Sequence, residues 1–185
     1  MPHGPHHGLR PLPDAGRCRD AHSPTRTAAH RAALMGASCP DGLAQAYRHA
    51  LYRIDTPTPI VLRIGATHPE LKVLAATLGQ PEWGAFLSAS NPHSRILRPA
   101  ANNRRLAALQ RALKSSGHLW LPGQGLDPLG QWPAEPSLWI AGLTEADART
   151  LALRFRQNAF VWCDAHTVAH LVWTRQIQDS VHPFC

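Results

Sequence analysis

Short apolar runs alternate with amphipathic segments along residues 41–173, and this alternation constrains the fold more than any other feature of the sequence. Apolar residues recurring every three or four positions predict helices over residues 41–52, 67–79, 102–114 and 144–155. Compact apolar and β-branched runs predict strands over residues 60–64, 84–90, 118–121, 137–141, 158–163 and 168–173, with a loop over 122–136. Mixed element types without an internal repeat predict one α+β domain over 41–185, its helices packed on a mixed β-sheet.

Helix boundaries carry recognisable signals. Thr67 and Glu70 stand at the spacing of a capping box, and Gly79 is expected to end the helix that follows. Asn102 is expected to cap the next helix and Thr144 the last one. In the helix after Asn102, leucines are expected to face inward and the four basic residues outward, namely Arg104, Arg105, Arg111 and Lys114.

The first 40 residues differ in composition from the rest of the chain. They contain six Pro, five His and five Arg and show no apolar periodicity, so they cannot bury enough surface to offset the entropy of ordering. The sequence therefore predicts a disordered N-terminal tail over 1–40. Met35, the only methionine besides Met1, offers an alternative start of translation.

The net charge of +7 permits a polyanionic partner without demonstrating one. Of the 19 basic residues only Lys72 and Lys114 are lysines, a skew typical of a GC-rich genome and not of selected phosphate contacts. Nucleic acid is thus a partner that the sequence allows but does not favour. No apolar run reaches the roughly 18 residues of a membrane helix, and residues 1–30 lack a secretory signal, so we expect a cytoplasmic protein without a membrane partner.

Cysteine and histidine gather near the C-terminus in a pattern that zinc could use. Cys163, His166 and His170 are followed by His182 and Cys185, and thiolates and imidazoles are zinc ligands. Cys163 also continues an apolar strand, where a free cysteine normally packs as a small core residue. Four cysteines in so long a chain make no disulfide framework. We therefore predict reduced thiols, no metal and no cofactor.

Five sequence blocks follow one another in a familiar order, at residues 60–65, 83–92, 102–104, 132–137 and 157–162. Together they resemble the bacterial domain of unknown function 3293 family, over residues 47–162. Residues 88–90 depart from the family pattern, in which a bulkier run is expected before Asn91-Pro92. The resemblance supports the domain boundary and implies no reaction.

Polar residues in these blocks lie where predicted strands and helices end. The candidate ligand-binding residues are Ser88, Asn91, Arg95, Asn102, Glu135, Gln157 and Asn158. Hydroxyls and carboxamides suit hydrogen-bond recognition better than acid–base chemistry, which needs titratable pairs. The same residue types also serve as caps and turn formers, so a purely structural role stays open for each.

The predicted function is a small-ligand-binding or regulatory domain with a polar crevice at the strand ends. An enzyme at the same crevice is an alternative, with Glu135 as its general acid or base. No serine elbow and no phosphate-binding loop accompanies it. A weak nucleic-acid-associated module is a further alternative, using Arg95, Arg98, Arg104, Arg105 and Arg111. The identity of the ligand and the oligomeric state stay open.

Overall fold

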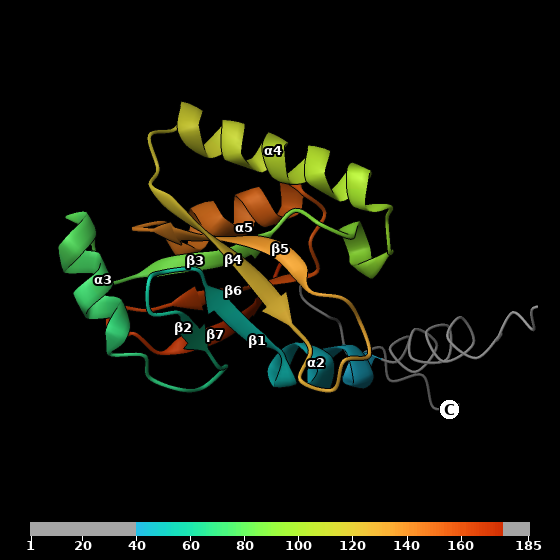
Figure 1. Cartoon of the computed structure of the whole chain (residues 1–185), viewed down its shortest axis with the longest axis horizontal. Coiled ribbons are helices and arrows are strands. Elements are labelled where there is room, and N and C mark those ends of the chain that lie inside the picture. Colours follow the sequence, from blue (N-terminus) through green and yellow to red (C-terminus); the bar gives the residue numbers. More distant parts are fainter. Residues whose placement is uncertain (1–39, 176–185) are drawn as a thin grey trace, which may run out of the picture.

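The computed structural model describes residues 40–175, and seven strands of this segment form one sheet (Figure 1). The strands are β1 (Leu51–Ile54), β2 (Ile60–Leu62), β3 (Gly84–Ser88), β4 (Trp120–Leu126), β5 (Glu135–Ala141), β6 (Ala159–Cys163) and β7 (Ala169–Trp173). Their order is β2-β1-β4-β5-β3-β6-β7. The helices are α2 (Pro40–His49), α3 (Glu70–Leu78), α4 (Pro99–Ser115) and α5 (Glu145–Arg154), with a 3-10 turn η1 (Pro92–Ser94).

The α+β class is confirmed, with helices covering a sheet. The sheet was expected to be mixed, whereas every pairing within residues 40–175 is antiparallel. Strands β6 and β7 form the expected hairpin. The predicted tail over 1–40 falls almost wholly outside the described residues.

The sheet is strongly curled. Beyond β2 the chain runs beside β7, where the Gly65 N–H donates to Ala169 O at 2.8 Å and the His68 N–H donates to Thr167 O at 2.9 Å. An isolated bridge between Thr67 and Val168 lies in the same segment. The two edges of the sheet thus approach each other, and the sheet has a convex and a concave face.

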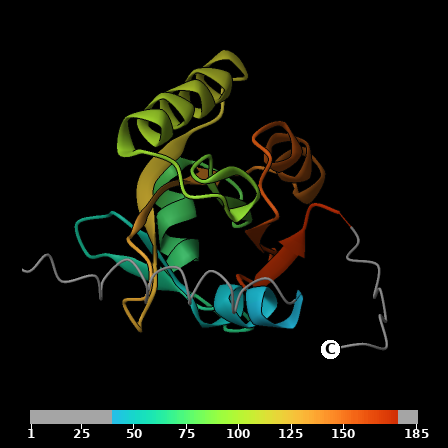
Figure 2. The same ribbon diagram turned by 90° about the vertical axis from the view of Figure 1, so that its right-hand side faces the viewer.

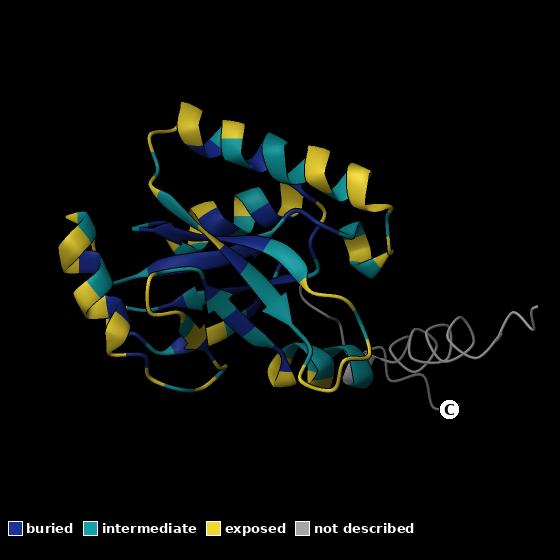
Figure 3. Ribbon diagram, viewed as in Figure 1, coloured by how far each residue is buried: buried dark blue, intermediate teal, exposed yellow. Residues whose placement is uncertain are grey.

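Side chains alternate between the two faces, as the two-residue period of a strand requires. On the convex face Leu87 and Ile140 pack with Leu109 of α4 and with α5. On the concave face Phe86 and Trp139 pack with β1, β2 and α3. Buried residues are concentrated in the central strands (Figure 3). Because both faces are covered, the strands are held by two cores.

Helix α2 lies apart from the helices that cover the convex face. Figure 2 shows α4 at the top of the molecule and α2 at the bottom. No helix of residues 40–175 is long and apolar enough to cross a membrane.

Strand β1 was not predicted, and several other strands differ from the prediction at their boundaries: β2 and β3 each end two residues early, and β5 begins at Glu135, within the expected loop. Residues 51 and 52 were expected in the first helix, but β1 begins at Leu51, directly after α2. Tyr52 and Ile54 are buried on one face of β1. Strand β4 runs on to Leu126, through the first part of the expected 122–136 loop.

Two predicted caps are also wrong. Thr67 makes no side-chain cap, and α3 begins after Pro69. Helix α4 begins at Pro99 and not after Asn102, because proline suits the first helical position, where no N–H donor is needed. Gly79 ends α3 in a left-handed conformation with φ of 61°, and Thr144 accepts a hydrogen bond from the Asp147 N–H, both as predicted.

Candidate functional site

A pocket of about 160 Å³ lies where several strands of the sheet begin or end. Strand β3 ends beside this pocket, whereas its antiparallel neighbours β5 and β6 begin there. The topology therefore brings together Asn91, which follows β3, Glu135, which starts β5, and Gln157, which precedes β6; all three line the pocket.

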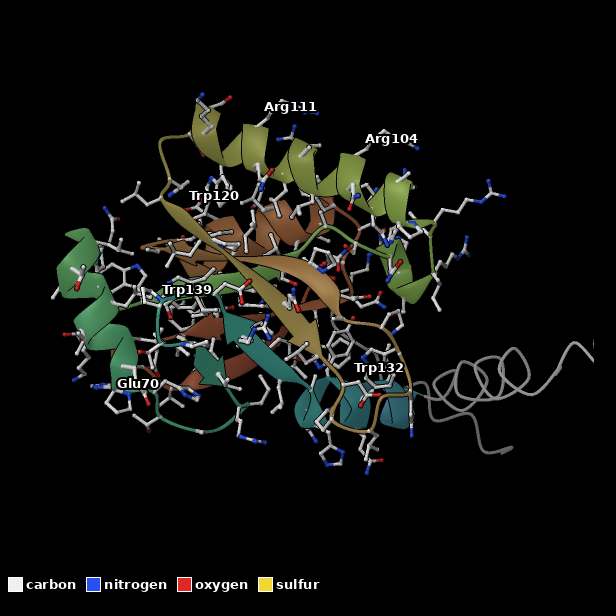
Figure 4. All side chains as sticks on the ribbon, in the orientation of Figure 1. Glu70, Arg104, Arg111, Trp120, Trp132 and Trp139 are labelled. Carbon is white, nitrogen blue, oxygen red and sulfur yellow. The ribbon has the colours of Figure 1, made fainter. Side chains whose placement is uncertain are left out.

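The walls are largely apolar and aromatic. Helix α2 and β1 supply one side, and the loop between β4 and β5 supplies another; Figure 4 shows Trp132 of this loop close to α2. The apolar and aromatic lining residues are Leu43, Ala46, Tyr47, Ala50, Tyr52, Ile96, Trp132 and Pro133. Few polar groups in an apolar cavity are typical of small-molecule sites.

Glu135 supplies the carboxylate of the pocket. It lies opposite Gly125 in the β4–β5 ladder, and a glycine has no side chain to cover it. Asn91 Nδ2 donates to Glu135 Oε1 at 2.5 Å. Burial raises the pKa of Glu135 above its usual value, and the hydrogen bond from Asn91 opposes this rise. None of the ion pairs formed within residues 40–175 includes this carboxylate.

Asn91 is fixed by hydrogen bonds to both the oxygen and the nitrogen of its side-chain amide. Its Oδ1 accepts hydrogen bonds from the Leu97 N–H and from Asn102 Nδ2, both at 2.9 Å. Its backbone N–H donates to Asn102 Oδ1 at 3.0 Å. Asn102 therefore positions Asn91 from the first turn of α4, a role different from the predicted cap.

The segment 91–94 holds three non-glycine residues in the left-handed region. The φ angles are 45° at Asn91, 52° at His93 and 58° at Ser94. Such residues cost roughly 1–3 kcal/mol each and persist only where their surroundings hold them. Here the His93 N–H donates to Arg156 O at 2.8 Å, and Asn158 Nδ2 donates to Ser94 Oγ at 2.9 Å. The strain is concentrated at the rim of the pocket, since Asn91 and Ser94 both line it.

Gln157 is buried at the base of the pocket. Its Nε2 donates to Ser90 O at 2.8 Å and to Phe155 O at 3.3 Å. Because both partners are carbonyl oxygens, the end of the amide that faces them is the nitrogen, and Oε1 is at the opposite end. Gln157 thus joins the end of β3 to the start of β6.

The remaining predicted site residues lie behind or outside the pocket. Ser88 Oγ donates to Pro136 O at 3.1 Å and accepts from the Ser90 N–H, which ties the strand ends together. Asn102 and Asn158 hold Asn91 and Ser94. Arg95 is exposed and is not part of the lining.

Two aromatic wall residues, Tyr47 and Tyr52, were expected only as part of the helix over 41–52. Tyr52 Oη donates to Tyr47 O at 2.6 Å. Burial raises the pKa of the Tyr47 phenol, which hydrogen bonding with Ser94 opposes and the Glu135 charge reinforces. Burial also raises the pKa of Tyr52. Nothing in the local pattern marked these tyrosines as pocket residues, because the polar groups that Tyr47 faces, Ser94 and Glu135, lie more than 40 residues away.

The sequence analysis did not predict Trp132 as a wall residue of the pocket. An aromatic residue in a long loop was nevertheless a signal that could have pointed to it. The side chain of Asp127 organises this loop by accepting hydrogen bonds from three backbone N–H groups, those of Leu129, Gln131 and Trp132. The loop is therefore shaped by its own residues and carries Trp132 to the pocket.

The candidate zinc ligands are not brought together. Cys163 is buried in the concave core, where burial raises the pKa of its thiol to about 12. His170 lies opposite Trp162 in the β6–β7 ladder, so it projects from the other face, where its Nε2 lies 2.9 Å from Asp164 Oδ2. His166 is exposed on the hairpin turn. His182 and Cys185 lie outside the described residues, and no group of three potential ligands occurs within 40–175.

The arginine run on α4 is interrupted. Arg95, Arg98, Arg104 and Arg111 are exposed. Arg105, which was expected to face outward, turns inward instead: its Nε donates to Ala89 O at 2.6 Å and its Nη2 to Phe155 O at 2.5 Å. The guanidinium of Arg105 thus connects α4 to the segment after β3 and to the end of α5.

Residues 87–160 match a protein family described as "Protein of unknown function (DUF3293)". The resemblance inferred from the sequence blocks is confirmed for this segment. Neither a curated protein nor a solved structure shows a significant match to the chain. The matched segment contains the polar floor of the pocket, whereas Tyr47 and Tyr52 precede it.

Proposed function

We propose that this domain binds a small organic molecule in the pocket between α2, the 127–134 loop and the strand ends. The observation that carries the proposal is the composition of the pocket: an apolar and aromatic wall surrounds a few fixed polar groups, among them Glu135 and Gln157. Such a cavity can bury the body of a ligand while the polar groups orient it.

The polar groups are held before any ligand arrives. Asn91 is fixed by Asn102 and Leu97, and Ser94 by Asn158. A preorganised site loses less conformational entropy on binding, which favours affinity. The left-handed conformations of Asn91, His93 and Ser94 support the same reading, because backbone strain clusters at ligand sites.

A fragment screen followed by ¹H–¹⁵N NMR on the full chain tests this proposal. We expect hits whose shift changes map to α2, residues 91–96 and the loop containing Trp132. Gly125 offers a matched blocking variant, because it lines the pocket and a Cβ there would lie 3.9 Å from its nearest neighbour, Glu135 Cβ. Gly125→Leu should fill the pocket and abolish the hits without removing a polar group. Hits that persist in Gly125→Leu, or map elsewhere, would contradict the proposal.

A second candidate, general acid–base catalysis in the same pocket, is favoured by one observation. Glu135 is a partly buried carboxyl whose pKa is raised, beside the Tyr47 phenol. Groups with such shifts cluster at catalytic sites, although structural networks also produce them. Catalysis would require that a ligand found by the screen be converted by the wild-type protein and not by Glu135→Gln.

A further inference from the structure

Glu135 and Gln157 bring hydrogen-bond acceptors to the floor of the pocket. Within residues 40–175, one hydrogen bond reaches the Glu135 carboxylate, from Asn91 to Oε1, which leaves Oε2 available. Among the described residues Gln157 hydrogen-bonds through its nitrogen alone, which leaves its carbonyl oxygen. The Oδ1 of Asn91 is occupied twice, and its Nδ2 keeps one N–H besides the one that it gives to Glu135. The pocket hydroxyls can donate or accept, so they exclude neither kind of ligand.

The electrostatics of the pocket point in the same direction. Glu135 brings a negative charge that no ion pair of the described residues neutralises. The last turn of α2 lines the pocket through Ala46 and Tyr47, and the carboxyl end of a helix carries partial negative charge; the basic residues of this turn, Arg48 and His49, are exposed and outside the lining. Arg95, a basic residue among the predicted ligand-binding candidates, is exposed and outside the lining. An anionic ligand would therefore meet repulsion at the floor.

The walls add a third feature. Tyr47, Tyr52 and Trp132 bring aromatic rings to the pocket, and such rings attract cations through their negative faces. Resting on the proposed function, we infer that the pocket selects a small organic cation: an ammonium group donates to Glu135 and Gln157 while its apolar body packs against the aromatic wall.

Three probes of matched size separate charge from shape: benzylamine, benzyl alcohol and benzoate. Their affinities are measured by NMR titration of the full chain at physiological salt and neutral pH, where benzylamine is a cation. We expect benzylamine to bind at least ten-fold more tightly than benzyl alcohol and benzoate not to bind. Glu135→Gln should remove the preference for benzylamine, because the variant keeps the shape of the side chain and loses its charge. Glu70→Gln, at an exposed position on α3, is the matched control and should leave the preference unchanged.

The outcomes distinguish this inference from the function on which it rests. If benzyl alcohol or benzoate binds as tightly as benzylamine, and Gly125→Leu prevents the binding, the pocket is a ligand site and the selection of cations is wrong. A preference for benzylamine that survives Glu135→Gln would also overturn the inference. If none of the three probes shifts pocket residues, the inference is contradicted, whereas the proposed function is decided by the fragment screen.

Discussion

Asn102 holds Asn91 at two points, accepting from its backbone N–H at 3.0 Å and donating to its side-chain oxygen at 2.9 Å. This pair fixes a left-handed residue whose own amide nitrogen reaches Glu135. The position of the carboxylate therefore depends on a side chain that does not line the pocket.

Asn102→Ala is expected to lower the free energy of unfolding by about 1–3 kcal/mol, because it leaves two polar groups of Asn91 without their partner. It should also weaken ligand binding. Asn103→Ala is the matched control: Asn103 is the exposed neighbour on α4 and should tolerate the change. Urea unfolding measures both variants, and equal midpoints would contradict the network.

Glu135→Gln is expected to stabilise the protein at neutral pH by on the order of 1 kcal/mol. Burial raises the pKa of Glu135, so the folded chain binds this proton more tightly than the unfolded chain does. Between the two pKa values folding takes up a proton, and the stability falls as the pH rises through that window. The advantage of Glu135→Gln should thus shrink as the pH falls and be smallest below about pH 4, where the wild-type carboxyl is mostly protonated in both states. A loss of stability at neutral pH would make Glu135 a structural clamp.

Arg105→Ala should cost about 2–3 kcal/mol, since a charged donor satisfies Ala89 O and Phe155 O between α4 and its neighbours. Arg104→Ala, one residue earlier and exposed, should change the stability by less than about 0.5 kcal/mol. Thermal unfolding of the two variants compares them directly. Equal effects would show that Arg105 contributes no more than a surface residue.

Gly123→Ala and Gly125→Ala should differ sharply although they lie two residues apart on β4. A Cβ at Gly123 would lie 2.5 Å from Arg53 O, whereas one at Gly125 would lie 3.9 Å from its nearest neighbour. We expect a loss of about 1–3 kcal/mol for Gly123→Ala, from overpacking. Gly125→Ala should fold normally with a smaller pocket. Urea midpoints measure the contrast, and tolerance at Gly123 would contradict it.

Cys163 is expected to resist alkylation in the folded protein. Its thiol is buried, and its pKa is raised to about 12, so little reactive thiolate is present at mildly alkaline pH. Iodoacetamide labelling read by peptide mass spectrometry should modify Cys163 only after denaturation. Rapid labelling of the native chain would show that the β6–β7 hairpin opens.

The sequence predicted the elements whose signals are local. Leu109 and Leu113 repeat along α4, and Gly79 and Thr144 mark helix ends by their own chemistry. Strand β1 was not predicted, because Leu51 and Tyr52 also continue the helical spacing of α2. The antiparallel order of the sheet depends on partners distant in the sequence, which spacing does not reveal.

The polar residues at the floor of the pocket could be predicted from the sequence for a similar reason. Asn91, Glu135 and Gln157 stand at strand ends, and strand ends can be read from the sequence. Arg105 and Asn102 could not be assigned, since a polar residue on a helix gives no sign of whether a neighbouring element covers it. Tyr47 reaches the pocket because α2 lies across the strand ends, and Tyr52 reaches it from β1, a strand that the sequence did not predict.

The pocket is assembled from segments far apart along the chain: Asn91 and Glu135 are separated by 44 positions, and Gln157 and its partner Ser90 by 67. Contacts of such long range require that the loops between them close, which costs entropy before the contacts form. A partly folded chain can hold its hairpin and helices and still lack the site altogether. A ligand of this pocket would therefore act as a selective probe of completed folding, and it would protect the whole domain against unfolding and proteolysis by mass action.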